Sequence, residues 1–171
     1  MSPDFKSPKD VSNDLLERTG AAMLEGDFET FADCFELPQE MDTFHGRNLV
    51  QTREELRAVF DAVLQYYRSM GVTEMARHCV EAEFVGPDTV QATHQSRLLA
   101  GTELVLPPYP ALSVLKRKDG VWRVASCQYA ISDAPDLNDA LAGRLLDKTP
   151  KNTGQTHPHP HRHQTPSEGE I

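Results

Sequence analysis

The 171-residue sequence carries 26 acidic and 17 basic residues, which gives a formal net charge of −9. This acidic balance argues against a nucleic-acid-binding surface, because such surfaces collect Lys and Arg against phosphates. No apolar run approaches the ~18 residues of a membrane span. The N-terminal stretch is rich in Pro, Lys and Asp, so we expect neither a membrane span nor a secretory signal and predict a cytoplasmic protein.

The chain is long enough for one domain with its own core, followed by a tail. Its cysteines, Cys34, Cys79 and Cys127, are widely spaced and lack a Cys-x-x-Cys pair. This pattern favours reduced thiols over a disulfide framework or a structural zinc site. The predicted segments are a flexible arm over residues 1–11, an α+β domain over 12–132, a possible short helix within 133–147 and a disordered His- and Pro-rich tail over 148–171.

Two helices are predicted at the start of the domain. Ser12 is a good N-cap, and apolar side chains then recur at helical spacing until Gly26 provides a stop. Asp27 can cap a second, shorter helix that Pro38 ends. The stripe that this second helix should bury is Phe28, Phe31 and Phe35.

A small strand pair and a long helix should follow. Residues 40–51 alternate on either side of a His45-Gly46-Arg47 turn, which predicts the strand pair. Thr52 and Glu55 form a capping box, and Gly71 is positioned as the C-terminal cap. The helix between them needs a sheet to cover its apolar face, which is made of Leu56, Val59, Phe60, Val63, Leu64, Tyr67 and Met70.

Residues 72–131 contain three long alternating runs joined by tight turns, which predict one curved antiparallel sheet. Alternation along residues 74–85 puts His78 on the apolar face of the first strand. Alternation after the next turn puts His94 on the apolar face of the second strand. Residues 107–110 read Pro-Pro-Tyr-Pro, so the third run should break at a sheet edge or a bulge.

Asp119-Gly120 predicts a two-residue hairpin that pairs Lys118 with Val121 and Ser113 with Ser126. In that register one face carries Ser113, Leu115, Trp122, Val124, Ser126 and Gln128. The other face carries Leu112, Val114, Ala125, Cys127, Tyr129 and Ile131. Since both faces are substantially apolar and helices cover only one, we expect the second face to form a homodimer interface.

The order of these elements, with the Gly26-Asp27 break, the His45-Gly46-Arg47 turn and the final Asp119-Gly120 hairpin, resembles the nuclear transport factor 2-like superfamily. That superfamily includes ketosteroid isomerases and polyketide cyclases. The resemblance covers residues 12–132 and implies a cystatin-like α+β cone, in which a strongly bent antiparallel sheet wraps around N-terminal helices. It also implies a pocket at the open end and frequent sheet-to-sheet dimers. We predict no cofactor.

Ketosteroid isomerases use a tyrosine, an aspartate base and a protonated aspartic acid in this fold. Alignment on the motifs brings Thr19, Leu37 and Ser113 to those positions. Thr19 and Ser113 lack the acidity of the required donors, and Leu37 cannot accept a proton. The sequence therefore argues against that activity, although Asp42 lies near the position of the base.

His78 and His94 are the main catalytic candidates, because both are expected on the concave face of neighbouring strands. A neutral imidazole there can act as a general acid or base. Dehydratases of the same superfamily are similar in combining pocket histidines with tyrosines, for which Tyr66, Tyr67 or Tyr109 are available. The alternative is that each histidine is a hydrogen-bonded core or rim residue.

Asp42 is the third catalytic candidate, because an aspartate can orient a histidine such as His45 three residues later. Turn-forming and surface roles explain both residues equally well. The predicted ligand contacts are Tyr67, Ser113, Ser126, Gln128 and Trp122.

The tail contains His157, His159, His161 and His163. A Pro-rich extended segment has about three residues per turn, so histidines two apart do not share a face. We therefore predict no metal site there.

The leading functional expectation is a homodimer that binds a small, apolar organic molecule, with no certified catalytic set. One alternative is an isomerase, lyase or cyclase that uses His94 and His78 for proton transfer. The other is a non-catalytic interaction scaffold whose pocket is filled by its own side chains. An enzyme needs both histidines to face one accessible cavity, whereas a scaffold needs neither.

Overall fold

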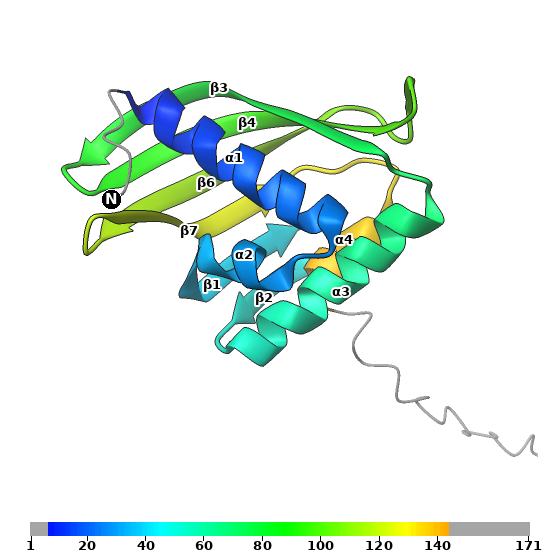
Figure 1. The fold of residues 1–171 in the computed structure, drawn as a ribbon, viewed down its shortest axis with the longest axis horizontal. Coiled ribbons are helices and arrows are strands. Elements are labelled where there is room, and N and C mark those ends of the chain that lie inside the picture. Colours follow the sequence, from blue (N-terminus) through cyan, green and yellow to red (C-terminus); the bar gives the residue numbers. More distant parts are fainter. Residues whose placement is uncertain (1–6, 144–171) are drawn as a thin grey trace, which may run out of the picture.

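The fold combines a strongly curved sheet with helices that lie against its concave face (Figure 1). The computed structural model describes residues 7–143. Within that range none of the helices has both the length and the apolar character needed to cross a membrane. In chain order the elements are α1 (Pro8–Glu25), α2 (Phe28–Asp33), β1 (Phe35–Thr43), β2 (Gly46–Val50), α3 (Arg53–Ser69), β3 (Glu74–Gly86), β4 (Thr89–Ala100), β5 (Glu103–Leu104), β6 (Tyr109–Lys118), β7 (Val121–Tyr129) and α4 (Pro135–Leu141).

The sheet has seven strands in the spatial order β2-β1-β7-β6-β4-β3, and β5 adds to β4 beside this path. The pairs between β3, β4, β6 and β7 are antiparallel, as the alternation of the sequence predicts. β1 pairs antiparallel with β2 but parallel with β7, so the sheet is mixed. No tight turn joins β1 to β7, so no local motif fixes its direction. The predicted α+β class, a bent sheet around N-terminal helices, is confirmed.

Helix α1 begins earlier than predicted. Ser7 is the N-cap, and its side chain accepts a hydrogen bond from the backbone N–H of Asp10 at 3.2 Å. Pro8 follows at a position that needs no N–H donor. Val11 is already buried, so residues 8–11 belong to the helix rather than to a flexible arm. Figure 1 shows α1 lying across the face formed by β3, β4 and β6.

Helices α2 and α3 have their predicted N-caps, but α2 ends at Asp33, so Phe35 and Pro38 lie in β1 and the expectation that this helix extends to them is wrong. Met70 is the C-cap of α3 and is exposed, so its predicted place on the buried face is also wrong. Asp27 caps α2 through the N–H of Thr30, and Thr52 caps α3 through the N–H of Glu55. The buried face of α3 consists of Leu56, Val59, Phe60, Val63, Leu64 and Tyr67, six of the predicted residues. It forms the main core with α2, the strand ends and α4.

Helix α4 is the short C-terminal helix, and it packs against α3 and β1. Leu137 and Leu141 are buried on it, as predicted. Leu145, Leu146 and the predicted tail lie outside the described residues.

The β6–β7 hairpin turns at Asp119 and Gly120, which both have positive φ angles, of 52° and 74°. This is the backbone conformation that a two-residue hairpin requires. The predicted pairing of Lys118 with Val121 is confirmed next to the turn. The proline-rich break separates β5 from β6.

Candidate functional site

The concave face of the sheet carries the candidate site. Residues that lie opposite one another on neighbouring strands form three rows across this face. One row consists of Arg77, Ser96 and Tyr109. The next consists of Cys79, His94, Ala111 and Tyr129. The third consists of Ala82, Ala92, Ser113, Cys127 and Met41. Because directly opposed residues share a face, these rows direct an arginine, a histidine and two tyrosines toward the helices.

A bulge at Val80 in β3 separates the two candidate histidines. Cys79 lies opposite His94 and Glu81 lies opposite Thr93, so Val80 is an extra residue. His78 therefore faces outward and is exposed to solvent, whereas His94 faces inward and is 3% exposed. The expectation that both histidines lie on the concave face is wrong, because strict alternation fails at the bulge.

A second bulge, at Ala125 in β7, shifts the hairpin register by one residue. Val114, not Ser113, lies opposite Ser126. Gln39 is fully buried next to this bulge. With its amide nitrogen oriented toward β7, Gln39 donates to the carbonyls of Val124 at 2.7 Å and Ala125 at 3.2 Å. The bulge thus has a dedicated side chain that satisfies its carbonyls.

This shift exchanges the predicted faces of the C-terminal half of β7. Cys127 and Tyr129 turn inward, where the Cys127 Sγ lies 3.3 Å from the Ser113 Oγ. Ser126 and Gln128 turn outward, so the prediction that they face the interior pocket is wrong. The predicted outward position of Cys127 and Tyr129 is wrong for the same reason.

Two adjoining cavities lie between the concave face and the helices. Their volumes are about 50 Å³ and about 30 Å³. The side chains that border both are Thr19, Phe35, Arg77 and Tyr129. The larger cavity extends toward Tyr67, Tyr109 and Leu141, and the smaller toward His94, Ser113 and Cys127. Since one water needs about 10–15 Å³, each cavity has room for a few waters or for part of a small ligand.

Arg77 lies where the two cavities meet. Its Nη2 donates to the carbonyl of Leu16 at 2.5 Å and to the hydroxyl of Thr19 at 2.7 Å. Its Nε is buried and has no hydrogen-bond partner among residues 7–143. In that same range no carboxylate lies within ion-pair distance of Arg77. The cavity wall therefore carries a positive charge without a negative partner.

His94 borders the smaller cavity as a neutral imidazole. Burial, with smaller contributions from the charges of Arg77 and His78, lowers the pKa of His94 to about 3. Its Nε2 is buried and has no hydrogen-bond partner within the described range. The cavity wall thus offers a second polar atom that nothing in the described chain satisfies.

The tyrosines of the site are neutral hydroxyls. Burial raises the pKa of Tyr67, Tyr109 and Tyr129 above the usual value. Burial also raises the pKa of the Cys127 thiol. Among the described residues that border the two cavities, Arg77 is therefore the one that is charged at neutral pH, and the side chains around it are neutral.

The other predicted ligand contacts lie in different places. Tyr67 borders the larger cavity and Ser113 the smaller one. Trp122 is buried in a separate cluster, with its ring 6.3 Å from Phe84 and 5.3 Å from the Arg117 guanidinium. It borders neither cavity. Ligand contact by Tyr67 and Ser113 stays a prediction.

The predicted pairing of Asp42 with His45 is wrong. The Nδ1 of His45 lies 2.6 Å from a carboxylate oxygen of Asp139 in α4. The carboxylate of Asp42 lies 3.4 Å from the Nε of Arg47, on the outward-facing side of β1. The true partner of His45 is 94 residues away in sequence, so no local pattern indicates it.

A double-mutant cycle distinguishes these two pairs. We expect the His45→Ala and Asp139→Ala changes to show a coupling of about 0.5–1 kcal/mol, because the pair is partly exposed to solvent. The His45→Ala and Asp42→Ala changes should add within about 0.3 kcal/mol. Urea unfolding of the single and double variants measures both couplings, and the reverse ranking would contradict the structural assignment.

Helix α4 contributes Leu141 to the wall of the larger cavity. The hydroxyl of Thr43 donates to the carbonyl of Asn138 at 3.3 Å. The side-chain amide of Asn48 donates to the carbonyl of Leu141 at 3.2 Å. Together with the His45–Asp139 contact, these bonds hold α4 against the β1–β2 hairpin.

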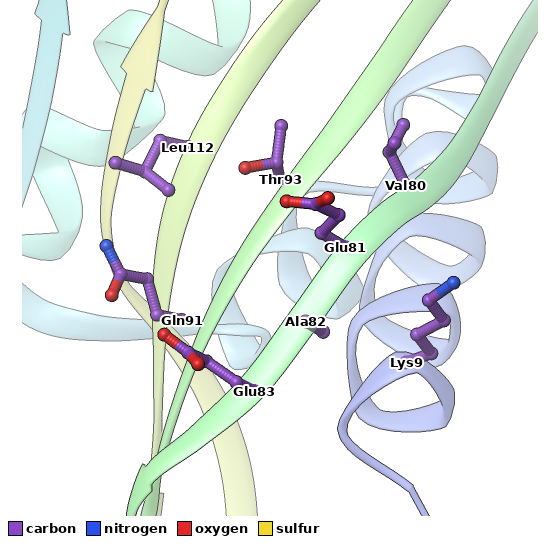
Figure 2. A pocket seen from close by; sticks show the side chains of 8 residues that line it. All are labelled: Lys9, Val80, Glu81, Ala82, Glu83, Gln91, Thr93 and Leu112. Atoms are coloured by element: carbon purple, nitrogen blue, oxygen red, sulfur yellow. The ribbon is translucent and has the colours of Figure 1, made fainter.

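The outward face of the sheet carries two grooves of about 470 Å³ and about 370 Å³. Figure 2 shows the larger groove, where Glu81, Thr93 and Leu112 project from neighbouring strands. Thr93 and Leu112 border both grooves, so the two are continuous. This face is more polar than predicted, because the bulge at Ala125 moves Cys127 and Tyr129 to the interior.

Comparison with solved structures shows the nuclear transport factor 2-like, cystatin-like fold. A domain of unknown function with a cystatin-like fold from Nostoc punctiforme is 18% identical, with a TM-score of 0.60 over 75% of this chain and 79% of that one. Aln2 from a Streptomyces species is 19% identical, with a TM-score of 0.59 over 76% and 96%. A ketosteroid isomerase-like protein from Erwinia carotovora atroseptica is 15% identical, with a TM-score of 0.55 over 75% and 98%. No protein-family model and no curated protein matches the chain.

Sequence reasoning missed Arg77, because alternation placed it on the face opposite to the apolar residues of β3. The feature of the sequence that points to Arg77 is its positive charge within a predicted strand. Arg77 is a single basic residue in the middle of a long strand, and β4 places a serine opposite it at Ser96. The inward face of β3 can be assigned only when the position of the bulge at Val80 is known, and the sequence does not indicate it.

Proposed function

We propose that the protein binds a small organic molecule in the two interior cavities. The observation that carries this proposal is that two residues bordering the same cavity, His94 and Arg77, each have a buried nitrogen (Nε2 and Nε) without a hydrogen-bond partner in the described chain. Folded proteins rarely leave buried polar atoms without partners. A ligand that supplies those partners accounts for both atoms.

Binding is better supported than acid–base catalysis. Proton transfer between His78 and His94 conflicts with their positions on opposite faces of the sheet. His94 alone has a pKa of about 3, far from the value near working pH that suits a general base. An interaction scaffold with a filled interior is also less well supported, because polar atoms border open space.

The test is nuclear magnetic resonance of the isotope-labelled full chain in the presence of neutral and charged fragments. The fragments have about six non-hydrogen atoms, because the two cavities together have room for about that many waters at about 10–15 Å³ each. We expect at least one fragment to shift the amide resonances of Arg77, His94 and Tyr129, which border the smaller cavity. Shifts confined to the outward face, or none with any fragment, would count against the proposal.

Two matched variants locate the binding. Ser113→Val adds volume inside the smaller cavity and should weaken fragment binding at least tenfold. Ser126→Val makes the same change on the outward side of β7 and should leave binding unchanged. Equal effects of the two changes would show that the fragments do not occupy the interior.

We also propose that a second copy of the chain pairs through the outward face. Leu112 and Val114 are its half-buried apolar side chains on β6, and the continuous grooves beside Leu112 offer a concave surface to a partner. Leu112 and Val114 remain on the face predicted for the dimer, whereas Cys127 and Tyr129 leave it for the interior.

Leu112→Glu is expected to convert a dimer into monomers, because it places a charge in the middle of that face. Sedimentation velocity measures the change, with the exposed Leu49→Glu in β2 as the control. A parent protein that already sediments as a monomer would sink this proposal.

A further inference from the structure

We propose that the ligand of the interior cavities carries a carboxylate group, which Arg77 and His94 bind together. This inference rests on the proposed binding function and specifies the chemical class of the ligand. Its starting point is the juxtaposition of one unpaired cation and one unpaired imidazole nitrogen on the wall of the same cavity.

The charge of Arg77 is the first argument. A buried or half-buried cation is normally paired with an anion, because desolvation without a partner is costly. The partners of Arg77 within residues 7–143 are a carbonyl and a hydroxyl, both neutral. The titratable groups around it are His94, Tyr67, Tyr109, Tyr129 and Cys127. Since burial holds each of them in its neutral form, none supplies the missing negative charge at neutral pH.

The geometry of the donors is the second argument. Of the three guanidinium nitrogens of Arg77, Nη2 donates to groups of α1, whereas Nε is buried without a partner. A carboxylate has two acceptor oxygens and can receive N–H groups from two residues at once. The Nε–H of Arg77 can donate a hydrogen bond to one oxygen, and the Nε2–H of His94, in the tautomer that carries this proton, can donate to the other. A neutral alcohol or amine cannot both accept hydrogen bonds from these two N–H groups and neutralise the charge of Arg77.

The size of the space is the third argument. The cavities of about 50 Å³ and about 30 Å³ meet at Arg77. At about 10–15 Å³ for each water, they exclude steroid-sized molecules and suit a short-chain monocarboxylate of about six non-hydrogen atoms. The carboxylate end lies between Arg77 and His94, and the chain extends toward Met41 and Leu141 in the larger cavity.

The alternative role for Arg77 is structural. Its bonds to Leu16 and Thr19 connect β3 to α1, and this connection needs no ligand. The two roles differ in their response to an added anion. A purely structural arginine gives no preference for a charged ligand over a neutral one of the same shape.

The experiment compares butanoate with butanamide, its neutral counterpart of equal size, by isothermal titration calorimetry of the full chain in a buffer free of carboxylates. We expect butanoate to bind at least tenfold more tightly. At about 100 times its dissociation constant, butanoate should raise the Tm by roughly 5–10 °C. This comparison needs no variant to fold.

Matched variants assign the preference to Arg77. Arg77→Met should abolish the advantage of butanoate, whereas Arg97→Met, which removes an arginine from the outward face of the neighbouring strand, should keep it. Equal affinity for the two probes in the parent protein would overturn the carboxylate inference while leaving small-molecule binding intact. Unchanged butanoate binding by a folded Arg77→Met variant would also overturn it. Failure of both probes to bind would overturn the carboxylate inference, whereas small-molecule binding would be overturned only if no fragment shifted the cavity resonances.

Discussion

Replacing Phe60 with alanine is expected to lower the free energy of unfolding by about 3–5 kcal/mol. Phe60 is 1% exposed and lies on the buried face of α3. Its ring centroid is 5.5 Å from that of Phe28 and 4.9 Å from that of Phe31, so it connects α3 to α2. Removal of the ring loses this packing and leaves a void that rigid neighbouring elements fill poorly. Urea denaturation followed by circular dichroism measures the loss.

The control for this change is Phe44→Ala. Phe44 follows β1 and is 67% exposed, so the same chemical truncation should alter stability by no more than about 0.5 kcal/mol. Comparable losses for both variants would mean that the aromatic cluster of α2 and α3 is not the centre of the core.

The parent protein is expected to lose stability as the pH falls, and the His94→Gln variant should lose less. An ordinary histidine has a pKa of 6.5, and burial lowers the pKa of His94 in the folded protein to about 3. Between these values the unfolded chain binds more protons than the folded chain, so the free energy of unfolding decreases as the pH drops from 6.5 toward 3. At a pH of about 4.5 the loss from this residue reaches about 2–3 kcal/mol.

The measurement is the difference in unfolding free energy between pH 7 and pH 4.5, from urea titrations of each protein. The parent should lose about 2–3 kcal/mol more than His94→Gln over this interval. His78→Gln removes the exposed imidazole on the outward face and should follow the parent profile. Identical pH profiles for the parent and His94→Gln would mean that His94 is not a buried neutral imidazole.

Local motifs predict much of the fold, because they specify short-range geometry. The capping box at Thr52 and the apolar stripe of α3 fix that helix almost to the residue. The Asp119-Gly120 turn fixes the hairpin and its first pairs. The start of α1 is harder to predict, because Ser7-Pro8 is typical both of a loose arm and of a helix start.

The candidate site was less predictable than the fold. A single bulge reverses the face of every residue beyond it; β3 contains two register shifts, after Cys79 and after Phe84, and β7 contains one. Val80 and Ala125 are ordinary strand residues, so neither marks its bulge in the sequence. Prediction placed His94 correctly on the concave face, but it put His78 there too and assigned Ser126 and Gln128 to the interior. The contact of His45 with Asp139 depends on where α4 docks, which no local spacing specifies.

The placement of α4 has a kinetic consequence. Leu141 forms part of the wall of the larger cavity, and hydrogen bonds from Thr43 and Asn48 hold the helix to the β1–β2 hairpin. A ligand that enters past α4 must wait for these contacts to break, so association should be slower than the roughly 10⁵–10⁷ M⁻¹s⁻¹ typical of open sites. The same barrier delays departure. A molecule held with a given affinity would then exchange with solution more slowly than it would at an open site.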